Sequence, residues 1–244
     1  MVEALAWGLV GSATLVLGAG IVMVRDPSAK VLGLVMGFGS GVLVSSLSFE
    51  MIEEAADVSP AGAAIGFFAG ALVFVGGDTI LARIGGGERD ASRPPTSSRS
   101  AAGLPIVLGS VLDGIPESAA LGLSLLEGGG VGLAILAAVF VSNLPESMAA
   151  SSELLQGGWS RRRVLLMWAG ITVVSGLAAA TGYRLLDGAS PSALAFTLSF
   201  AGGAVLAMLT TSMIPEAYER AGRVVGLAVT AGFATAFGIH WLDT

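Results

Sequence analysis

Long apolar stretches alternate with short polar ones along almost the whole chain. A helix needs about 20 mostly apolar residues to cross the hydrocarbon core of a bilayer. A window of that length predicts helices at 4–24, 31–52, 62–83, 104–126, 131–153, 164–186, 192–214 and 224–242. The pattern therefore predicts an all-α integral membrane protein with eight transmembrane helices, and residues 1–244 form a single transmembrane domain.

One long polar linker interrupts this pattern. Residues 84–103 are rich in Gly, Ser, Pro and Arg, and such a composition does not build a packed core. We expect these residues to form a flexible cytoplasmic loop between the third and fourth spans.

The composition supports a lipid environment. Hydrophobic residues make up 54% of the chain and charged residues 12%, whereas a soluble domain carries about a quarter of its residues as charges. The 36 glycines fit this class, because small residues let membrane helices approach closely. The absence of cysteine excludes disulfides, thiolate metal sites and a cysteine nucleophile. No cofactor, no enzymatic activity and no nucleic-acid partner is expected.

The basic residues predict the orientation. Cytoplasmic loops of membrane proteins carry an excess of Lys and Arg. Of the 12 basic residues, 11 fall in alternate loops on one side of the predicted spans, and only Arg184 falls on the other. We therefore expect a protein of the plasma (inner) membrane with both termini outside.

The chain contains two internal sequence similarities, which we call echoes. The fourth and fifth spans share a frame that ends in Pro-Glu-Ser, at 113–118 and 142–147, an offset of 29 residues. The second and seventh spans match at an offset of 162 residues. These seven pairs are Phe38/Phe200, Gly41/Gly203, Leu47/Leu209, Met51/Met213, Ile52/Ile214, Glu54/Glu216 and Ala55/Ala217.

The second echo joins spans of opposite direction, which is typical of an inverted-repeat transporter with its site near the midplane. It predicts a 3+2+3 arrangement, in which the last three helices repeat the first three upside down. Chance similarity of two glycine-rich helices is the alternative.

Three acidic residues lie near the middle of predicted spans: Asp113, Glu117 and Glu146. Each costs roughly 3 kcal/mol at the centre of a bilayer on insertion scales. No span has a basic residue near its middle, so these acids must be protonated or must hold a cation from outside. A structural polar network is the alternative, although three carboxylates without a donor satisfy one another poorly.

The spacing favours a metal cation. Asp113 and Glu117 lie one turn apart on one helix face, and Ser142 and Asn143 precede Glu146 by about one turn. Pro116 and Pro145 each free a backbone carbonyl, because proline has no N–H to donate. The predicted ligands of a divalent cation, which is the substrate, are Asp113, Glu117, Ser142, Asn143 and Glu146.

Further acids lie near the ends of spans. Glu50, Glu53, Glu54 and Asp57 are candidates for an acidic mouth, and Asp78, Glu153 and Glu216 for a cytoplasmic exit. Ordinary solvated helix ends are the alternative, which we prefer for these residues.

The chain resembles the ZIP family of divalent metal transporters. That family has eight spans, outside termini, a cytoplasmic loop after span three and a metal site on spans four and five. Its span-four motif, His-Asn-x-Pro-Glu-Gly, is similar to residues 113–118, and its span-five motif, His-Asn-x-Pro-Glu, to residues 142–146. The resemblance implies transport of zinc, iron or manganese by a homodimer in which a bundle holding the site slides against a scaffold.

The departures from the motifs bear on the metal. Asp113 and Ser142 replace the two motif histidines, and Gly114 replaces the first asparagine. Oxygen ligands suit Mn²⁺, Mg²⁺ or Fe²⁺ better than a site with histidine nitrogen does.

Two other functions compete with transport. A membrane protein of the same fold that acts as a sensor or assembly partner is favoured by the missing histidines. An intramembrane aspartyl protease using Asp78 and Asp113 is disfavoured, because Val75-Gly-Gly-Asp78 departs from the Gly-x-Gly-Asp pattern of such enzymes.

Overall fold

The computed structural model describes residues 1–84, 103–127 and 133–243, and within them every regular element is a helix. The α-helices are α1 (Val2–Val24), α2 (Ala29–Ser46), α3 (Glu54–Val58), α4 (Pro60–Ile84), α5 (Gly103–Ser124), α6 (Leu133–Gln156), α7 (Arg161–Leu186), α8 (Pro191–Met208), α9 (Ile214–Ala221) and α10 (Val225–Asp243). Most of the predicted loop, residues 85–102, lies outside the described residues. The prediction of an all-α fold is confirmed for the described part.

Short segments of other helical types continue or connect these helices. The π-helices η1 (Leu47–Glu53) and η3 (Leu209–Met213) continue α2 and α8, and the 3-10 turns are η2 (Leu125–Glu127) and η4 (Gly222–Val224). The two π-helices begin at Leu47 and Leu209, which are equivalent positions of the echo at offset 162. π-Helical turns are rare and frequently lie at functional sites.

Serine side chains begin four of the long helices. Ser28 accepts a hydrogen bond from the backbone N–H of Val31, and Ser190 accepts one from that of Ala193. Ser160 caps α7 in the same way, and Ser59 caps α4. These caps satisfy backbone donors that a helix N-terminus leaves without partners. Ser28 and Ser190 are again equivalent positions at offset 162.

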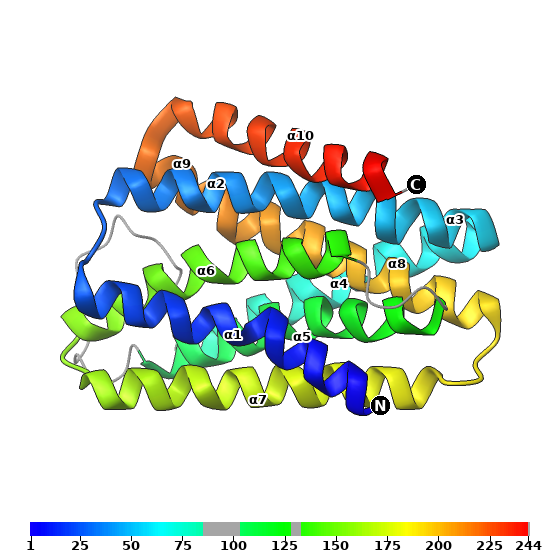
Figure 1. The fold of residues 1–244 in the computed structure, drawn as a ribbon, viewed down its shortest axis with the longest axis horizontal. Helices are drawn as coiled ribbons and strands as arrows, with labels where there is room; N and C mark the ends of the chain where they lie inside the picture. The colour runs from blue at the N-terminus through cyan, green and yellow to red at the C-terminus, as the bar shows by residue number, and fades with distance from the viewer. Residues whose placement is uncertain (85–102, 128–132, 244) are drawn as a thin grey trace.

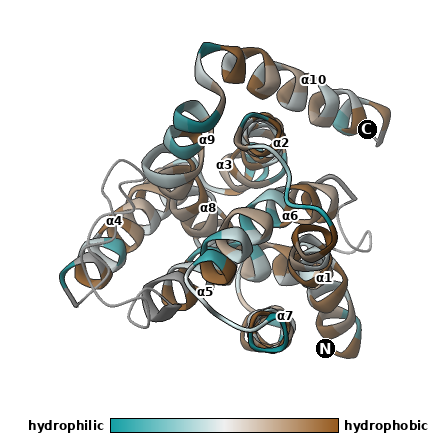
Figure 2. Ribbon diagram, turned by 90° about the vertical axis from the view of Figure 1, so that its left-hand side faces the viewer, coloured by the Kyte–Doolittle hydropathy of each residue, from teal (hydrophilic) through white to brown (hydrophobic). Residues whose placement is uncertain are grey.

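The long helices form one elongated bundle with both chain termini at the same end (Figure 1). Seen along the bundle, α5, α6 and α8 lie in the interior, and α4, α7 and α10 lie on the outside (Figure 2). Within the described residues, five helical stretches are long and apolar enough to cross a membrane: Val2–Val24, Ala29–Val58, Pro60–Leu81, Arg161–Leu186 and Pro191–Leu242. The fold is thus compatible with membrane integration.

The outward face of α4 is apolar. Its exposed side chains include Ile65, Phe68, Leu72, Val73, Val75 and Ile80. A soluble monomer rarely exposes so continuous an apolar surface, because water would then order around it. Lipid chains are the environment that this face fits.

The helix contacts come in pairs. Helix α4 packs against α8 and α10 packs against α2; α1 packs against α6 and α7 packs against α5; α2 packs against α6 and α8 packs against α5. Helices α1 and α7 pack against each other. The same set of contacts results when α1 is exchanged with α7, α2 with α8, α4 with α10 and α5 with α6.

Glycines permit the closest of these contacts. A Cβ atom at Gly70 of α4 would overlap the carbonyl oxygen of Phe200, and one at Gly232 of α10 would overlap that of Phe38. Both glycines and both phenylalanines are related by the offset of 162 residues. The two outer helices are therefore held against α8 and α2 by backbone-to-backbone contact.

Gly70→Ala is expected to destabilise the fold. The added methyl group meets the backbone of Phe200, which cannot move as a side-chain end can, and overpacking of this kind costs about 1–3 kcal/mol. Gly76→Ala on the same helix is the control, since no atom lies within 4 Å of the added Cβ. Thermal unfolding in detergent micelles should show a lower midpoint for Gly70→Ala alone. Equal midpoints for the two variants would contradict the close contact.

Candidate metal site

Two acidic residues of α5 are enclosed by the bundle. Asp113 is 5% exposed and Glu117 is 3% exposed, and they lie one helical turn apart on either side of Gly114 and Pro116. Helix α5 stays continuous through Pro116, which removes one backbone donor from its ladder. Charged side chains are almost never this buried without a compensating partner.

Helix α6 presents three polar residues in the corresponding stretch. Ser142 is 1% exposed and Asn143 is 4% exposed, whereas Glu146 is half-buried. The Ser142 hydroxyl lies 3.4 Å from Oε1 of Glu117, to which it donates, and 3.1 Å from the carbonyl oxygen of Val139. The structure therefore brings the two repeated motifs together through Ser142 and Glu117.

The three carboxylates of the two motifs interact. Glu146 and Asp113 both lie close enough to Glu117 to act electrostatically on its charge. In a medium of low dielectric constant this repulsion is much stronger than in water. A cation between the carboxylates would relieve the repulsion.

Asn143 is engaged with another helix. Its Nδ2 donates to the carbonyl oxygen of Gly11 on α1 at 3.4 Å, and the neighbouring Ser147 hydroxyl lies 3.3 Å from the carbonyl oxygen of Thr14. Asn143 is one of the five predicted ligands, whereas its partner helix α1 carries no residue of the predicted site. The signal was present as the small residues of α1, such as Gly11 and Gly18, over which α6 packs.

The described residues contain no group of three or more Asp, Glu or His side chains arranged to hold a metal ion. Of the five predicted ligands, Glu117 and Ser142 are in contact, and Asp113 and Glu146 act on Glu117 from nearby. A shell around a cation would need hydroxyl, amide or backbone oxygens in addition to carboxylates, or a movement of α5 against α6.

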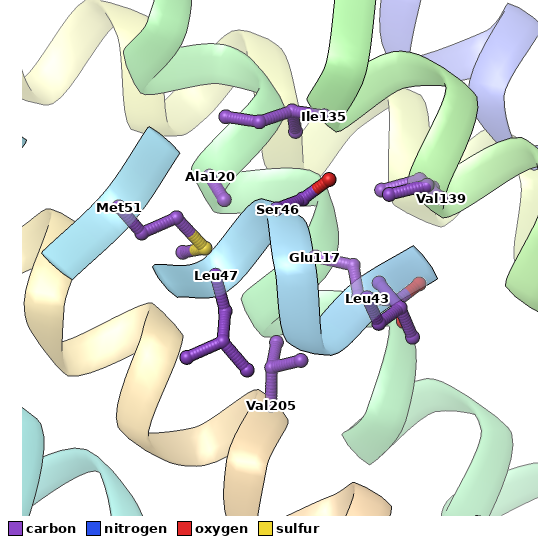
Figure 3. Close-up of a pocket in the computed structure, with 10 residues that line it drawn as sticks. Leu43, Ser46, Leu47, Met51, Glu117, Ala120, Ile135, Val139 and Val205 are labelled. Atoms are coloured by element: carbon purple, nitrogen blue, oxygen red, sulfur yellow. The ribbon is translucent and has the colours of Figure 1, made fainter. Parts of the chain in front are cut away.

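A small cavity adjoins Glu117 (Figure 3). Its volume is about 20 Å³, which is enough for one water molecule. Glu117 and Ser46 are its polar lining residues, and the others are Leu43, Leu47, Met51, Ala120, Ile135, Ala138, Val139 and Val205. Ser46 is not among the predicted ligands, because it belongs to neither Pro-Glu-Ser frame.

The cavity lies on one particular side of Glu117 along the bundle. Ala120 follows Glu117 by one turn toward the end of α5, and Ile135 and Val139 come from the first turns of α6. The cavity thus lies on the side of Glu117 away from the end of the bundle that carries most of the arginines. That end joins α1 to α2 and α6 to α7, on the left of Figure 1.

The acids at the arginine-rich end are paired. Arg220 of α9 donates through Nη2 to Glu216 at 2.7 Å and to Glu153 of α6 at 3.1 Å. Glu153 and Glu216 are therefore ion-paired residues rather than simple solvated helix ends. Asp78, the third acid predicted at this exit, is half-buried in α4.

At the opposite end, Glu50 pairs with the single histidine of the chain. Nδ1 of His240 lies 2.6 Å from Oε1 of Glu50, and the imidazole stacks on Phe49 with ring centres 5.3 Å apart. Glu53 and Asp57 are exposed, as expected for residues at a mouth or a solvated helix end.

Comparison with models of known protein families and with curated proteins finds no match to this chain.

Proposed function

We propose that the chain transports a divalent metal cation across a membrane through the carboxylate site on α5 and α6. The observation that carries the proposal is the placement of Asp113 and Glu146, which both act electrostatically on the buried carboxylate of Glu117 inside an apolar bundle. Every Lys and Arg of the chain lies near the ends of the long helices or between them, so none lies beside these acids in sequence.

A purely structural role explains these acids poorly. Buried ionisable groups within membrane helices are costly and mark ion or substrate sites. The hydroxyl of Ser142 donates to Glu117, and one weak bond of 3.4 Å does not offset the repulsion of two neighbouring carboxylates. A cation supplied from solution offsets it directly.

The proposed architecture is eight spans in a 3+2+3 arrangement, with α5 and α6 as the central pair. Support comes from the paired helix contacts and from the shared offset of 162 residues between the two glycine contacts, the two serine caps and the two π-helices. Inverted repeats of this kind place a substrate site at the repeat interface near the midplane. The central pair carries all five predicted ligands.

The remaining parts of the proposal follow the resemblance and the charge pattern. We propose a homodimer in the inner membrane with both termini outside. The substrate is zinc or a harder ion such as manganese, iron or magnesium, because the five predicted ligands all offer oxygen.

The second candidate is a non-transporting protein of the same fold that acts as a sensor or assembly partner. It is favoured by one observation, namely that the described carboxylates do not already form a cluster of metal ligands. A small cavity beside Glu117 fits either candidate, since a transporter closes its site in part of its cycle.

Metal uptake by the purified chain in liposomes separates the two candidates. Transport predicts a metal-dependent influx of Mn²⁺ or Zn²⁺ that exceeds the leak of empty liposomes and saturates with concentration. A flux equal to the leak for all four metals, from protein that elutes as a single folded species, would exclude transport and favour the second candidate.

Asp113→His is expected to shift the metal preference toward zinc. Histidine nitrogen binds the borderline-soft Zn²⁺ well, whereas an all-oxygen site suits harder ions. Inhibition of Mn²⁺ uptake by added Zn²⁺ should therefore require about tenfold less zinc in the variant, a gain of about 1.4 kcal/mol in zinc binding. Asp113→Asn is the control, because it removes the same charge without adding an imidazole. If both variants respond equally to zinc, ligand type does not set the preference.

A further inference from the structure

Arg220 links two helices that are far apart in the sequence, α9 and α6. Its guanidinium binds Glu216 of its own helix through Nε at 3.0 Å and through Nη2 at 2.7 Å. The same Nη2 reaches Glu153 of α6 at 3.1 Å. One guanidinium thus joins α9 to the helix that carries Ser142, Asn143 and Glu146.

The arginine is held in place by packing. A Cβ atom at Gly33 of α2 would lie 2.8 Å from the Cβ of Arg220 and 2.8 Å from the carbonyl oxygen of Ala217. Helix α9 therefore rests directly on α2 at this point. The Arg220 side chain is 18% exposed, against 54% for that of Glu153. The arginine is therefore the more firmly packed partner of the ion pair.

The bridge has no counterpart in the other repeat. The offset of 162 residues relates Arg220 to Val58, and the offset of 29 residues relates Glu153 to Ser124. Glu216 does have a counterpart, Glu54. The two repeats therefore share the helical framework and one acid. The guanidinium of Arg220 and the carboxylate of Glu153 have no equivalent residue in the other repeat.

A second polar link at that end is equally one-sided. The Ser152 hydroxyl donates to Oδ2 of Asp26, in the connection between α1 and α2, at 3.1 Å. The residue equivalent to Ser152 in α5 is Leu123, which is buried and apolar. Both links tie the end of α6 to its surroundings, and the equivalent residues of α5, Ser124 and Leu123, carry no charge.

We infer that Arg220 is a tethered counter-ion. Its ion pair with Glu153 keeps the path between Glu117 and the arginine-rich end of the bundle closed. Two inverted repeats of equal sequence would give two end states of equal free energy, one open toward each side. The ion pair between Arg220 and Glu153 ties α6 to α9 at the arginine-rich end, and it favours the state in which that end is closed, since a conformational equilibrium follows differential contacts. The cavity beside Glu117, which lies toward the opposite end, is consistent with this state.

The same geometry suggests how the route opens. Glu153 and Glu216 share one guanidinium, which leaves the group with a net charge of −1 and two carboxylates that can accept a cation. A divalent ion that leaves the site toward this end competes with Arg220 for the two carboxylates and loosens α6 from α9. This role in transport rests on the proposed function; the closing of the end by Arg220 does not.

The chain offers a clean test, because it has no cysteine of its own. Ala149 is 4% exposed and lies on α6 between Glu146 and Glu153, so Ala149→Cys reports opening of this end by its rate of reaction with N-ethylmaleimide. In that background, Arg220→Gln and Glu153→Gln should each accelerate labelling by about 2- to 5-fold, the range of a partly exposed ion pair. The double variant should be labelled no faster than Arg220→Gln alone, since both changes remove the same ion pair.

Arg223→Gln is the matched control. It removes the same charge from the same end, and the described residues offer Arg223 no ion pair. Labelling in Arg220→Gln at the rate of Arg223→Gln, or strictly additive effects of the two bridge variants, would overturn the inference. Arg220→Lys keeps the charge without the fork and should give an intermediate rate.

Labelling is measured without metal, so it does not depend on transport. Altered labelling in a chain that shows no metal uptake would uphold the bridge and reject the proposed function. Uptake with labelling unchanged from the control would do the reverse.

Discussion

Glu117→Gln is expected to reduce metal uptake at least tenfold. The variant keeps the size of the side chain and a carbonyl oxygen near Ser142, but it removes the negative charge at the centre of the three interacting carboxylates. Loss of one charge-assisted ligand costs roughly 1.5–3 kcal/mol, which is about tenfold or more in affinity. The measurement is the initial rate of Mn²⁺ uptake into liposomes across a range of metal concentrations.

Stability should not fall with transport in this variant. An amide is cheaper than a carboxylate to bury, and Glu117 is 3% exposed beside two like charges. The unfolding midpoint in micelles is therefore expected to stay or to rise. Loss of uptake together with loss of folding would point to a structural role for Glu117.

Glu3→Gln is the matched control for this experiment. Glu3 lies exposed in the first turn of α1 and contributes nothing to the site, so the same chemical change should leave uptake as it is. Uptake in Glu117→Gln equal to that in Glu3→Gln would contradict a carboxylate site at α5.

Trp168→Ala is expected to be the most destabilising substitution considered. Trp168 of α7 is completely buried and packs in a cluster with Leu15, Ala19, Leu154, Val164 and Ile171. Removing so large a side chain leaves a cavity and costs about 3–5 kcal/mol. The cost should be measured as a shift of the denaturant midpoint in micelles at constant slope.

The hydrogen bond of Trp168 can be separated from its packing. The indole Nε1 donates to the Ser151 hydroxyl of α6 at 2.8 Å. Trp168→Phe keeps an aromatic ring but loses this bond, and it should cost about 1–3 kcal/mol, less than Trp168→Ala. Leu166→Ala, at a residue 62% exposed on the same helix, should cost little in comparison. A loss in Trp168→Ala no greater than in Leu166→Ala would show that α7 is not held by this cluster.

The positions of the helices were predictable from the sequence alone. Hydrophobicity over about 20 residues is a local property, and each predicted stretch is helical wherever it is described. Local signals also mark helix starts, since Ser28, Ser160 and Ser190 each cap the helix that follows. The Pro-Glu-Ser frames marked α5 and α6 as the pair with polar interiors before any contact was known.

The burial of the site was predictable in part. Two interrupted apolar spans with acids near their centres indicated enclosed carboxylates, and Asp113 and Glu117 are indeed buried. The approach of Ser142 to Glu117 depends on how α5 and α6 rotate about their axes. Residue spacing within each helix defines a face, but it does not define the angle at which two faces meet.

Other features were decided by the tertiary structure. Asn143 bonds to α1, Ser46 lines the cavity, and Arg220 reaches Glu153 at a separation of 67 residues. Each of these depends on which helices become neighbours, and that choice follows from the shape of the packed surfaces, such as the glycines that let α4 meet α8. Hydropathy reports only whether a residue prefers lipid to water, so it determines that this chain forms apolar helices and leaves their partners to packing.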